Sequence, residues 1–318
     1  MTTTIIHLTG GLGNQLFQVA AALSQSETGL CKVETTLGKP RLSNSGNPEV
    51  FSFELPNQLV EFKIQSRFAN FVCRAIGYGV RQSVHEKRTR IQKMHTLLAS
   101  FAIRIVLVIF TGLFKSVYIS SGIGYSQKAL EQRDKYLIGY FQSHIFVDKV
   151  ASNLRLIAVP DKGEQLKELI LLSVEEVPLV VHYRFGDYLT EKNFGIPSSD
   201  YYSEGIQLLW NSGKYKKIWV FSDDLQMARS VLPSHLNQFA RWISEVDNSS
   251  AATLEAMRYG RAYVIANSTF SWWGAFLSYE QSAPVVAPTP WFQFGESPRD
   301  ILPSQWIKLP AFDKAISK

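Results

Sequence analysis

Three short polar clusters in the C-terminal half of the chain each follow a predicted strand. The first lies in VVHYRFGDYLT and contains His182, Arg184 and Asp187. A guanidinium carries rigid paired donors that match a diphosphate, and a nearby carboxylate or imidazole can take a proton from an attacking hydroxyl. The simpler alternative is an Arg184–Asp187 ion pair that closes a loop, with His182 packed in the sheet.

The second cluster is Ser222, Asp223 and Asp224 in WVFSDDLQ. Adjacent carboxylates point in different directions, so they cannot easily chelate one metal ion. A carboxylate can accept the ring N–H and the amino hydrogens of guanine, whereas a Ser or Asp before a helix satisfies free N–H groups there. We expect one of the two aspartates to cap a helix.

The third cluster opens a predicted helix in VIANSTFSWWGAFLS. Free backbone N–H groups and hydroxyls at a helix N-terminus form a site for an anion, although an ordinary N-cap needs only one such residue. The candidate residues here are Asn267, Ser268, Thr269, Phe270, Ser271 and Trp272. Their polar side chains exceed what capping requires, and the three clusters together predict a cradle for a diphosphate with carboxylates nearby.

The elements that position these clusters alternate regularly after residue 163. Strands are predicted at 177–184, 216–224, 261–268 and 283–292, with helices at 163–173, 200–213, 224–232, 251–260 and 270–280. Strands separated by helices of this length indicate a parallel sheet with crossover helices. Ligands bind beyond the carboxyl ends of such strands, which is where the three clusters fall.

Near the N-terminus, GGLGNQLFQ at 10–18 lies between a predicted strand at 4–10 and a predicted helix at 14–27. The loop matches only part of the dinucleotide fingerprint G-x-G-x-x-G, because Leu16 stands where the third glycine belongs. No acidic residue is well placed for a ribose, since Glu34 follows only after a polar stretch. A nicotinamide cofactor is therefore disfavoured. The stretch 36–60 is rich in Pro, Gly, Asn and Ser and is predicted to form loops.

A basic and then apolar segment covers residues 81–114. Residues 81–95 hold five Lys or Arg and one Glu, and Arg104 is the only charge in the 19 residues that follow. The length could span a bilayer, but a central arginine costs about 2.5–3.5 kcal/mol on insertion scales. A spanning helix would also separate the glycine loop from the downstream clusters. We favour a buried helix or a surface patch that touches anionic lipid.

The composition is that of a folded globular protein, with 46% hydrophobic and 19% charged residues among 318. This length allows two domains, which we place at 1–160 and 161–318. The formal charge of +6 favours anionic partners, but the basic excess lies at 81–95 without interleaved aromatics, so nucleic-acid binding is not expected. Cys31 and Cys73 lack metal-ligand spacing and favour a reducing compartment.

Five segments, in order along the chain, resemble the bacterial α-1,2-fucosyltransferases of glycosyltransferase family 11. They are GGLGNQLFQ at 10–18, GYFQS at 139–143, HYRFGD at 182–187, VFSDD at 220–224 and ANSTFSWWGAFLS at 266–278. The resemblance implies an α/β fold of the GT-B kind, with two Rossmann-type domains that face a central cleft. It also implies GDP-fucose as donor, a galactose-containing acceptor, inversion at the anomeric carbon, and no metal or other cofactor.

The resemblance implies roles for the C-terminal clusters as well. The C-terminal domain would hold the donor, with Arg184 on its phosphates and with 222–224 and 267–272 lining the nucleotide. Either Asp187 or His182 would act as the general base, and we prefer Asp187.

The glycine loop would face the reacting centre, with Gly11 and Gly13 contacting the donor and with Asn14 as a catalytic residue near the diphosphate and the acceptor. Two features depart from the family pattern. Phe185 stands where many relatives carry a second basic residue, and YGRAYVIANS lacks the Cys and His that often precede IANS.

We expect a bacterial cytoplasmic enzyme of O-antigen synthesis, with peripheral contact at the inner membrane, where lipid-linked glycans are built. No secretory signal is visible. The alternatives are a nicotinamide enzyme and a non-catalytic nucleotide-sugar or glycan-binding protein on the same fold. A binding protein would have lost its phosphate and base groups, but Arg184, Asp187 and Asn14 are all present.

Overall fold

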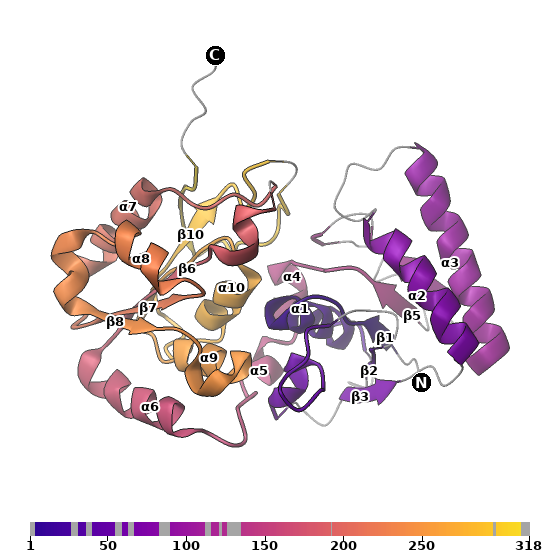
Figure 1. The fold of residues 1–318 in the computed structure, drawn as a ribbon, viewed down its shortest axis with the longest axis horizontal. Helices are drawn as coiled ribbons and strands as arrows, with labels where there is room; N and C mark the ends of the chain where they lie inside the picture. Colours follow the sequence, from indigo (N-terminus) through magenta and orange to yellow (C-terminus); the bar gives the residue numbers. More distant parts are fainter. Residues whose placement is uncertain are drawn as a thin grey trace, which may run out of the picture. The chain divides into compact units, whose positions relative to one another are not determined.

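The computed structural model describes residues 4–26, 31–35, 40–54, 59–62, 67–82, 90–111, 116–120, 123–125, 135–191, 193–294 and 297–312. The chain divides into two compact units (Figure 1). Unit 1 is Met1–Ala158 with Pro298–Ile301, and unit 2 is Val159–Ser297 with Leu302–Lys318. Each unit has its own parallel sheet with helices, which confirms the predicted α/β class of two Rossmann-type domains of the GT-B kind. The return of the chain to unit 1 at Pro298 was not predicted.

Within its described residues, unit 1 is built on a parallel sheet in the order β3-β2-β1-β5-β4. The strands are β1 (Thr4–His7), β2 (Cys31–Glu34), β3 (Leu59–Phe62), β4 (Ser116–Ile119) and β5 (Lys135–Ile138). The helices are α1 (Leu12–Leu23), α2 (Arg67–Gln82), α3 (Arg90–Thr111), α4 (His144–Asp148) and α5 (Ala151–Leu154), with a 3₁₀ turn η1 at Glu49–Ser52. The central strand β1 is buried throughout, as expected for a parallel strand covered on both faces.

The predicted basic and apolar segment at 81–114 contains the end of α2 and all of α3. These helices pack against each other, and α3 also packs on β4. Ile103 and Val106 of α3 join Ala69 of α2 in a hydrophobic cluster with residues of the sheet. In the part of the chain that the structure describes, no helix is long and apolar enough to cross a membrane. The segments 83–89 and 112–115 lie outside the described residues.

The sheet of unit 2 has the order β11-β10-β9-β6-β7-β8 in its described residues. The strands are β6 (Leu179–Tyr183), β7 (Ile218–Ser222), β8 (Ala240–Ile243), β9 (Ala262–Val264), β10 (Val285–Thr289) and β11 (Ile307–Pro310). The helices are α6 (Glu164–Glu176), α7 (Ser199–Trp210), α8 (Leu225–Val231), α9 (Ser250–Met257) and α10 (Thr269–Phe276), with 3₁₀ turns η3 (Gly186–Leu189), η4 (Ser234–Phe239) and η5 (Val246–Asn248). The strands and helices predicted after residue 163 are confirmed, whereas β8 and β11 were not predicted.

Each sheet has a topological switch point at its first strand. In unit 2, β6 lies between β7 and β9, so the chain winds away from β6 in both directions. In unit 1, β1 lies in the same way between β2 and β5. Ligands of open α/β sheets bind where the loops at such a point diverge. The loops after β6 and β9 carry the first and third clusters, and those after β1 and β5 carry GGLGNQLFQ and GYFQS.

Candidate active site

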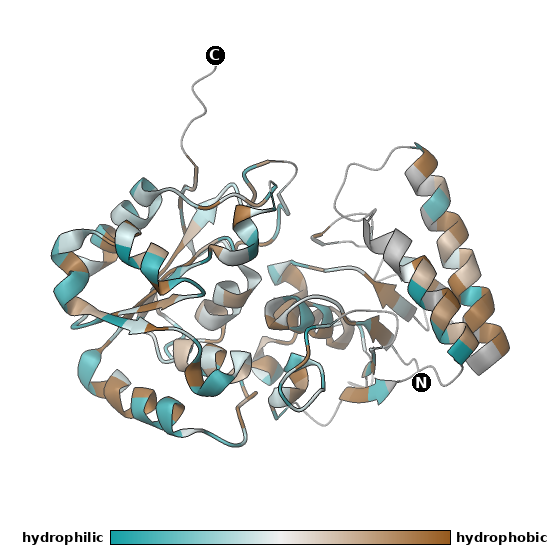
Figure 2. Ribbon diagram, viewed as in Figure 1, coloured by the Kyte–Doolittle hydropathy of each residue, from teal (hydrophilic) through white to brown (hydrophobic). Residues whose placement is uncertain are grey.

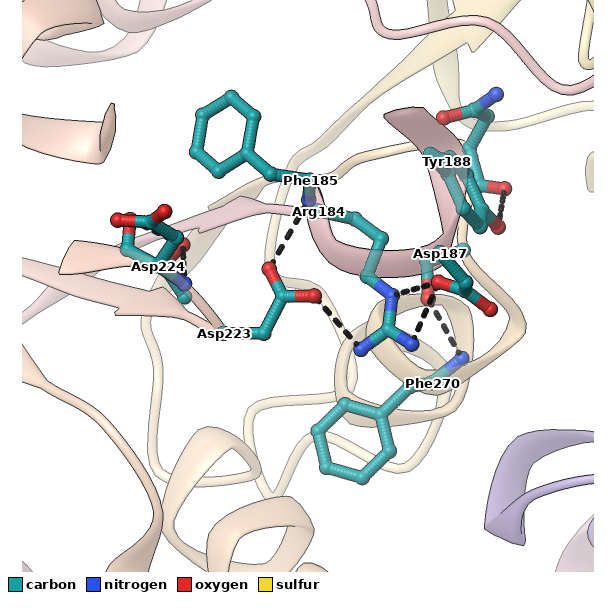
Figure 3. A network of polar contacts seen from close by, with 10 residues as sticks. Arg184, Phe185, Asp187, Tyr188, Asp223, Asp224 and Phe270 are labelled. Carbon is teal, nitrogen blue, oxygen red and sulfur yellow. Dashed lines mark hydrogen bonds and ion pairs between the residues drawn. The ribbon is translucent and has the colours of Figure 1, made fainter. Parts of the chain in front are cut away.

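Arg184, directly after β6, is the centre of a polar network in unit 2 (Figure 3). Its Nε and Nη2 donate hydrogen bonds to Oδ1 of Asp187 at 3.0 and 2.8 Å. Its Nη1 forms an ion pair with Oδ2 of Asp223, 3.1 Å away. Asp187 lies in η3, whereas Asp223 follows β7. The anticipated Arg184–Asp187 ion pair is therefore present, and a second carboxylate from the neighbouring strand joins it.

Asp223 also fixes the turn that follows β6. Its Oδ1 accepts the backbone N–H of Phe185 at 3.0 Å. A Cβ on Gly186 would lie 2.5 Å from Oδ2 of Asp223, so the absence of a side chain there allows this close approach. Phe185 is 2% exposed and belongs to the hydrophobic core of unit 2. The position where the family pattern often has a second basic residue thus faces the core in this chain.

The network leaves Arg184 able to bind an anion. A guanidinium has five N–H donors, and the contacts with Asp187 and Asp223 use three of them. The Arg184 side chain is 24% exposed, so part of it is open to a ligand. One cation between two carboxylates leaves a local excess of negative charge, however, and a diphosphate needs additional positive potential nearby.

The start of α10 can supply that potential, and Tyr188 links it to Arg184. The guanidinium carbon of Arg184 lies 5.9 Å from the centroid of the Tyr188 ring. The Tyr188 hydroxyl donates to the carbonyl of Asn267 at 3.0 Å. Phe270, in the first turn of α10, packs against His182 with 6.1 Å between ring centroids. The first and third clusters therefore adjoin, and the positive end of the α10 dipole lies at this edge of the sheet.

Several polar residues of the third cluster hold the loop after β9 in place. The side-chain amide of Asn267 donates to the carbonyls of Phe194 and Gly195 at 2.9 and 3.1 Å. Ser268 caps α10 by accepting the N–H of Phe270 at 3.3 Å. These contacts give both residues a structural role beside any role in ligand binding.

Ser271 and Trp272 lie inside unit 2, where neither has exposed surface. The Ser271 hydroxyl donates to backbone carbonyls of preceding residues at 3.2 and 3.4 Å. Trp272 stacks on Phe276 with 4.8 Å between centroids. Their burial argues against the expected direct contact with a nucleotide. Thr269 and Phe270 are only partly buried, so they remain candidates for such a contact.

In the second cluster, Asp224 caps a helix, as expected for one of the two aspartates. Its Oδ1 accepts the N–H of Met227 in the first turn of α8 at 2.9 Å. The Ser222 hydroxyl bonds the backbone N–H and carbonyl of Asp224, each at 3.0 Å, and closes the turn. The Asp223 carboxylate contacts Arg184. Recognition of guanine by this cluster stays a prediction.

His182 is 5% exposed at the end of β6. Burial, with a smaller contribution from the charge of Arg184, lowers the pKa of His182 to about 3. Its Nδ1 is buried and has no hydrogen-bond partner among the described residues. The imidazole is therefore neutral near pH 7 and is a weak base. Of the two predicted bases, the more exposed Asp187 is the better placed.

In unit 1, GGLGNQLFQ and GYFQS meet at the switch point. Gly10 has a φ of +77°, a left-handed conformation that favours glycine, and a Cβ there would lie 2.6 Å from Nδ2 of Asn14. Oδ1 of Asn14 accepts a hydrogen bond from Nε2 of Gln142 at 2.9 Å. Gln142 follows β5 and was not among the predicted site residues, although its segment was part of the resemblance.

The N-terminus of α1 is occupied by a carboxylate of the protein itself. Oε2 of Glu49 accepts the N–H of Leu12 at 2.7 Å, and Glu49 is 5% exposed. A diphosphate would meet negative charge here instead of free N–H groups. This argues against a dinucleotide or donor phosphate at Gly11 and Gly13. Nothing in the sequence near Glu49 indicated this contact.

Two Rossmann-type units, each with a polar cluster at the switch point of its sheet, define a two-domain α/β protein suited to binding a nucleotide-activated substrate. The model of Glycosyl transferase family 11 matches residues 3–310, so the chain belongs to this family and is a glycosyltransferase.

Two relatives cover nearly the whole chain. An alpha-1,2-colitosyltransferase of Escherichia coli is 26% identical, over 97% of this chain and 99% of the relative. The O-antigen biosynthesis glycosyltransferase WbnK of Escherichia coli is also 26% identical, over 95% and 99%. Among solved structures, the E. coli ADP-heptose lps heptosyltransferase II matches with a TM-score of 0.49 and 10% identity, over 99% of this chain and 92% of that one. The NodZ alpha-1,6-fucosyltransferase soaked with GDP-fucose matches with a TM-score of 0.46 and 12% identity, over 93% and 99%.

Proposed function

We propose that this glycosyltransferase moves L-fucose from GDP-β-L-fucose to the 2-hydroxyl of a galactoside, with inversion, in the synthesis of a bacterial O-antigen. Membership of family 11 supports a sugar transfer, and the names of two relatives support an α-1,2 linkage and O-antigen synthesis. One observation carries the proposal. Two carboxylates hold Arg184 at the switch point of unit 2, and two of its N–H donors remain for a diphosphate.

The leaving group would be stabilised by Arg184 and the start of α10. As the bond between the anomeric carbon and the phosphate oxygen breaks, its electron pair passes to the diphosphate. N–H donors that are already oriented stabilise such charge without reorganisation. Asp187 and Asp223 provide that orientation for Arg184. With these groups on the phosphates, we expect the reaction to need no metal or other cofactor.

The acceptor hydroxyl would transfer its proton to Asp187 while the hydroxyl oxygen attacks the anomeric carbon. Oδ1 of Asp187 accepts both hydrogen bonds from Arg184, so Oδ2 is the oxygen that would take the proton. Attack on the face opposite to the diphosphate turns a β-linked donor into an α-linked product. His182, with a pKa of about 3, would stay neutral throughout.

A colitose donor is the second candidate, because one relative is named for colitosyl transfer. Both candidates would use the same phosphate site and differ only in the sugar. We place the reaction in the bacterial cytoplasm at the inner membrane, on a lipid-linked galactose-containing acceptor.

The test incubates the purified protein with GDP-fucose or nucleotide-activated colitose and a β-galactoside, with and without EDTA. Nucleotide release and the linkage of the product are followed together. We expect galactoside-dependent release of GDP, an α-1,2-linked fucoside, and no effect of EDTA. Product from the colitose donor alone would select the second candidate. No release with any donor, and no protection of the fold by GDP, would refute both, and nicotinamide cofactors would be tested next.

A further inference from the structure

Helix α3 exposes a stripe of large apolar side chains to solvent. The exposed residues are Ile91, Met94, Leu98, Phe101, Ile105 and Ile109, between 41% and 67% exposed. They recur at intervals of three or four residues, so they lie along one side of the helix. Figure 2 shows hydrophobic residues along the length of α3. Another side of α3, with Ile103 and Val106, is buried against the sheet, so the exposed stripe is additional to the core face.

The helix that packs against α3 continues this pattern. In α2, Phe68 and Phe71 are 65% and 71% exposed. Scattered surface hydrophobics are ordinary, but this many exposed apolar side chains on two helices that pack against each other indicate an interaction surface.

The charged residues of α2 and α3 all have the same sign. The two helices contain Arg67, Arg74, Arg81, Arg90, Lys93 and Arg104, and neither contains Asp or Glu. Four of these, Arg67, Arg74, Arg90 and Arg104, are exposed. Arg67 and Arg74 of α2 are seven residues apart, so they share one side of that helix. An apolar stripe accompanied only by cations needs a partner that is both apolar and anionic.

We propose that the α2–α3 face binds the surface of an anionic bilayer. The apolar stripe would enter the boundary between headgroups and acyl chains, as the apolar face of an amphipathic interfacial helix does. The four exposed arginines would contact lipid phosphates, to which basic segments beside a membrane are attracted. Arg104, near the middle of α3, can extend its long side chain toward the headgroups.

A second copy of the chain fits this face less well. Pairing two such faces would set the exposed Arg67, Arg74, Arg90 and Arg104 of one copy against the same four of the other, with no carboxylate in either helix to offset them. A bilayer that contains acidic lipid instead offers the opposite charge. The proposal concerns α2 and α3 of unit 1, which carry none of the polar clusters, and it does not depend on which sugar is transferred.

Co-sedimentation of the full chain with vesicles tests the proposal. We expect binding to vesicles of phosphatidylethanolamine and phosphatidylglycerol that weakens with added salt, and about tenfold weaker binding to phosphatidylcholine vesicles. Leu98→Ser/Phe101→Ser/Ile105→Ser should lower binding about tenfold or more. The matched control is Leu171→Ser/Val174→Ser on α6 of unit 2, where both residues are 75% exposed, and it should bind as the wild type does.

A charge variant separates loss of binding from loss of folding. Arg90→Gln/Arg104→Gln removes exposed charges without touching the core, and each lost arginine should weaken binding to the acidic vesicles about fivefold. Equal binding by wild type and both variants would overturn the proposal. So would a dimer that the apolar variant dissociates and that shows no vesicle binding, because the occupant would then be a second copy. The assay contains no sugar nucleotide, so its outcome is independent of the fucosyltransferase test.

Discussion

Nη1 of Arg184 and Oδ2 of Asp223 lie 3.1 Å apart across the ends of β6 and β7. The same carboxylate accepts the N–H of Phe185 at 3.0 Å. Asp223 therefore couples the position of the guanidinium to the path of the backbone that carries it. A diphosphate would meet donors already set in place, which is the arrangement that favours stabilisation of developing charge.

Removing the guanidinium tests its proposed role directly. Arg184→Ala should lower kcat by a factor on the order of 10²–10³ with the fold retained. Arg184→Lys should recover little of this, because a single ammonium cannot replace the planar fork that serves both carboxylates and a phosphate. Steady-state kinetics and circular dichroism provide the measurement. Arg261→Ala, which removes an exposed ion pair to Glu280, is the control and should keep full activity. Near-normal transfer by Arg184→Ala would contradict the assignment.

The close approach of Asp223 to Gly186 predicts coupling between the two positions. A Cβ at Gly186 would lie 2.5 Å from Oδ2, so Gly186→Ala should displace the carboxylate and lower the free energy of unfolding by about 1–3 kcal/mol. In the Asp223→Ala background the same change should cost less than about 1 kcal/mol. Urea unfolding of the wild type, the two single variants and the double variant in a double-mutant cycle measures the coupling. If the two substitutions have additive effects on the free energy of unfolding, the contact between position 186 and Asp223 does not contribute to stability.

The glycine loop should act on the acceptor and not on the donor phosphates. Because Glu49 occupies the N-terminus of α1, Asn14→Ala should leave the affinity for GDP within about twofold. Loss of a hydrogen bond to the acceptor should raise its KM about threefold to tenfold. Calorimetric titration with GDP and kinetics at varied acceptor concentration distinguish the two effects. A loss of GDP affinity with an unchanged acceptor KM would show that the glycine loop acts on the donor and not on the acceptor.

The buried imidazole of His182 predicts a pH dependence of stability. Its pKa falls from the ordinary 6.5 to about 3 in the folded protein, so between these values only the unfolded chain binds a proton there. Stability should therefore decrease as the pH falls through this window, by up to about 1.4 kcal/mol per pH unit. Relative to His182→Gln, the wild type should lose about 2 kcal/mol between pH 7 and pH 5. Urea unfolding at both pH values tests this, and equal losses in the two proteins would contradict it.

The regular elements of unit 2 could be predicted because their patterns are strong. The strand β6 is an unbroken buried run between helices, as parallel strands are. The strands β8 and β11 escaped prediction because each lies at an edge of the sheet. They read ARWI and IKLP, and most of their residues are partly or fully exposed. A strand that buries so little gives a weak hydrophobic pattern.

The candidate site could be predicted only where its partners are close in sequence. Arg184 and Asp187 are three residues apart, so the sequence alone allows their ion pair to be predicted as one alternative. The contact of Arg184 with Asp223 depends on the pairing of β6 with β7, which one sequence does not reveal. Burial of Trp272 likewise depends on what α10 packs against. The contact of Glu49 with α1 joins segments far apart in the chain.

Unit 1 is completed by Pro298–Ile301, which comes from far along the chain. The carbonyl of Asp300 accepts the N–H of His144, at the start of α4, at 2.8 Å. A fragment that ends at Ala158 would lack this partner. Chimeras that graft the first unit of one family member onto the second unit of another must therefore carry both stretches as a matched pair. A single crossover would join the N-terminal piece to a returning segment that evolved against a different neighbour.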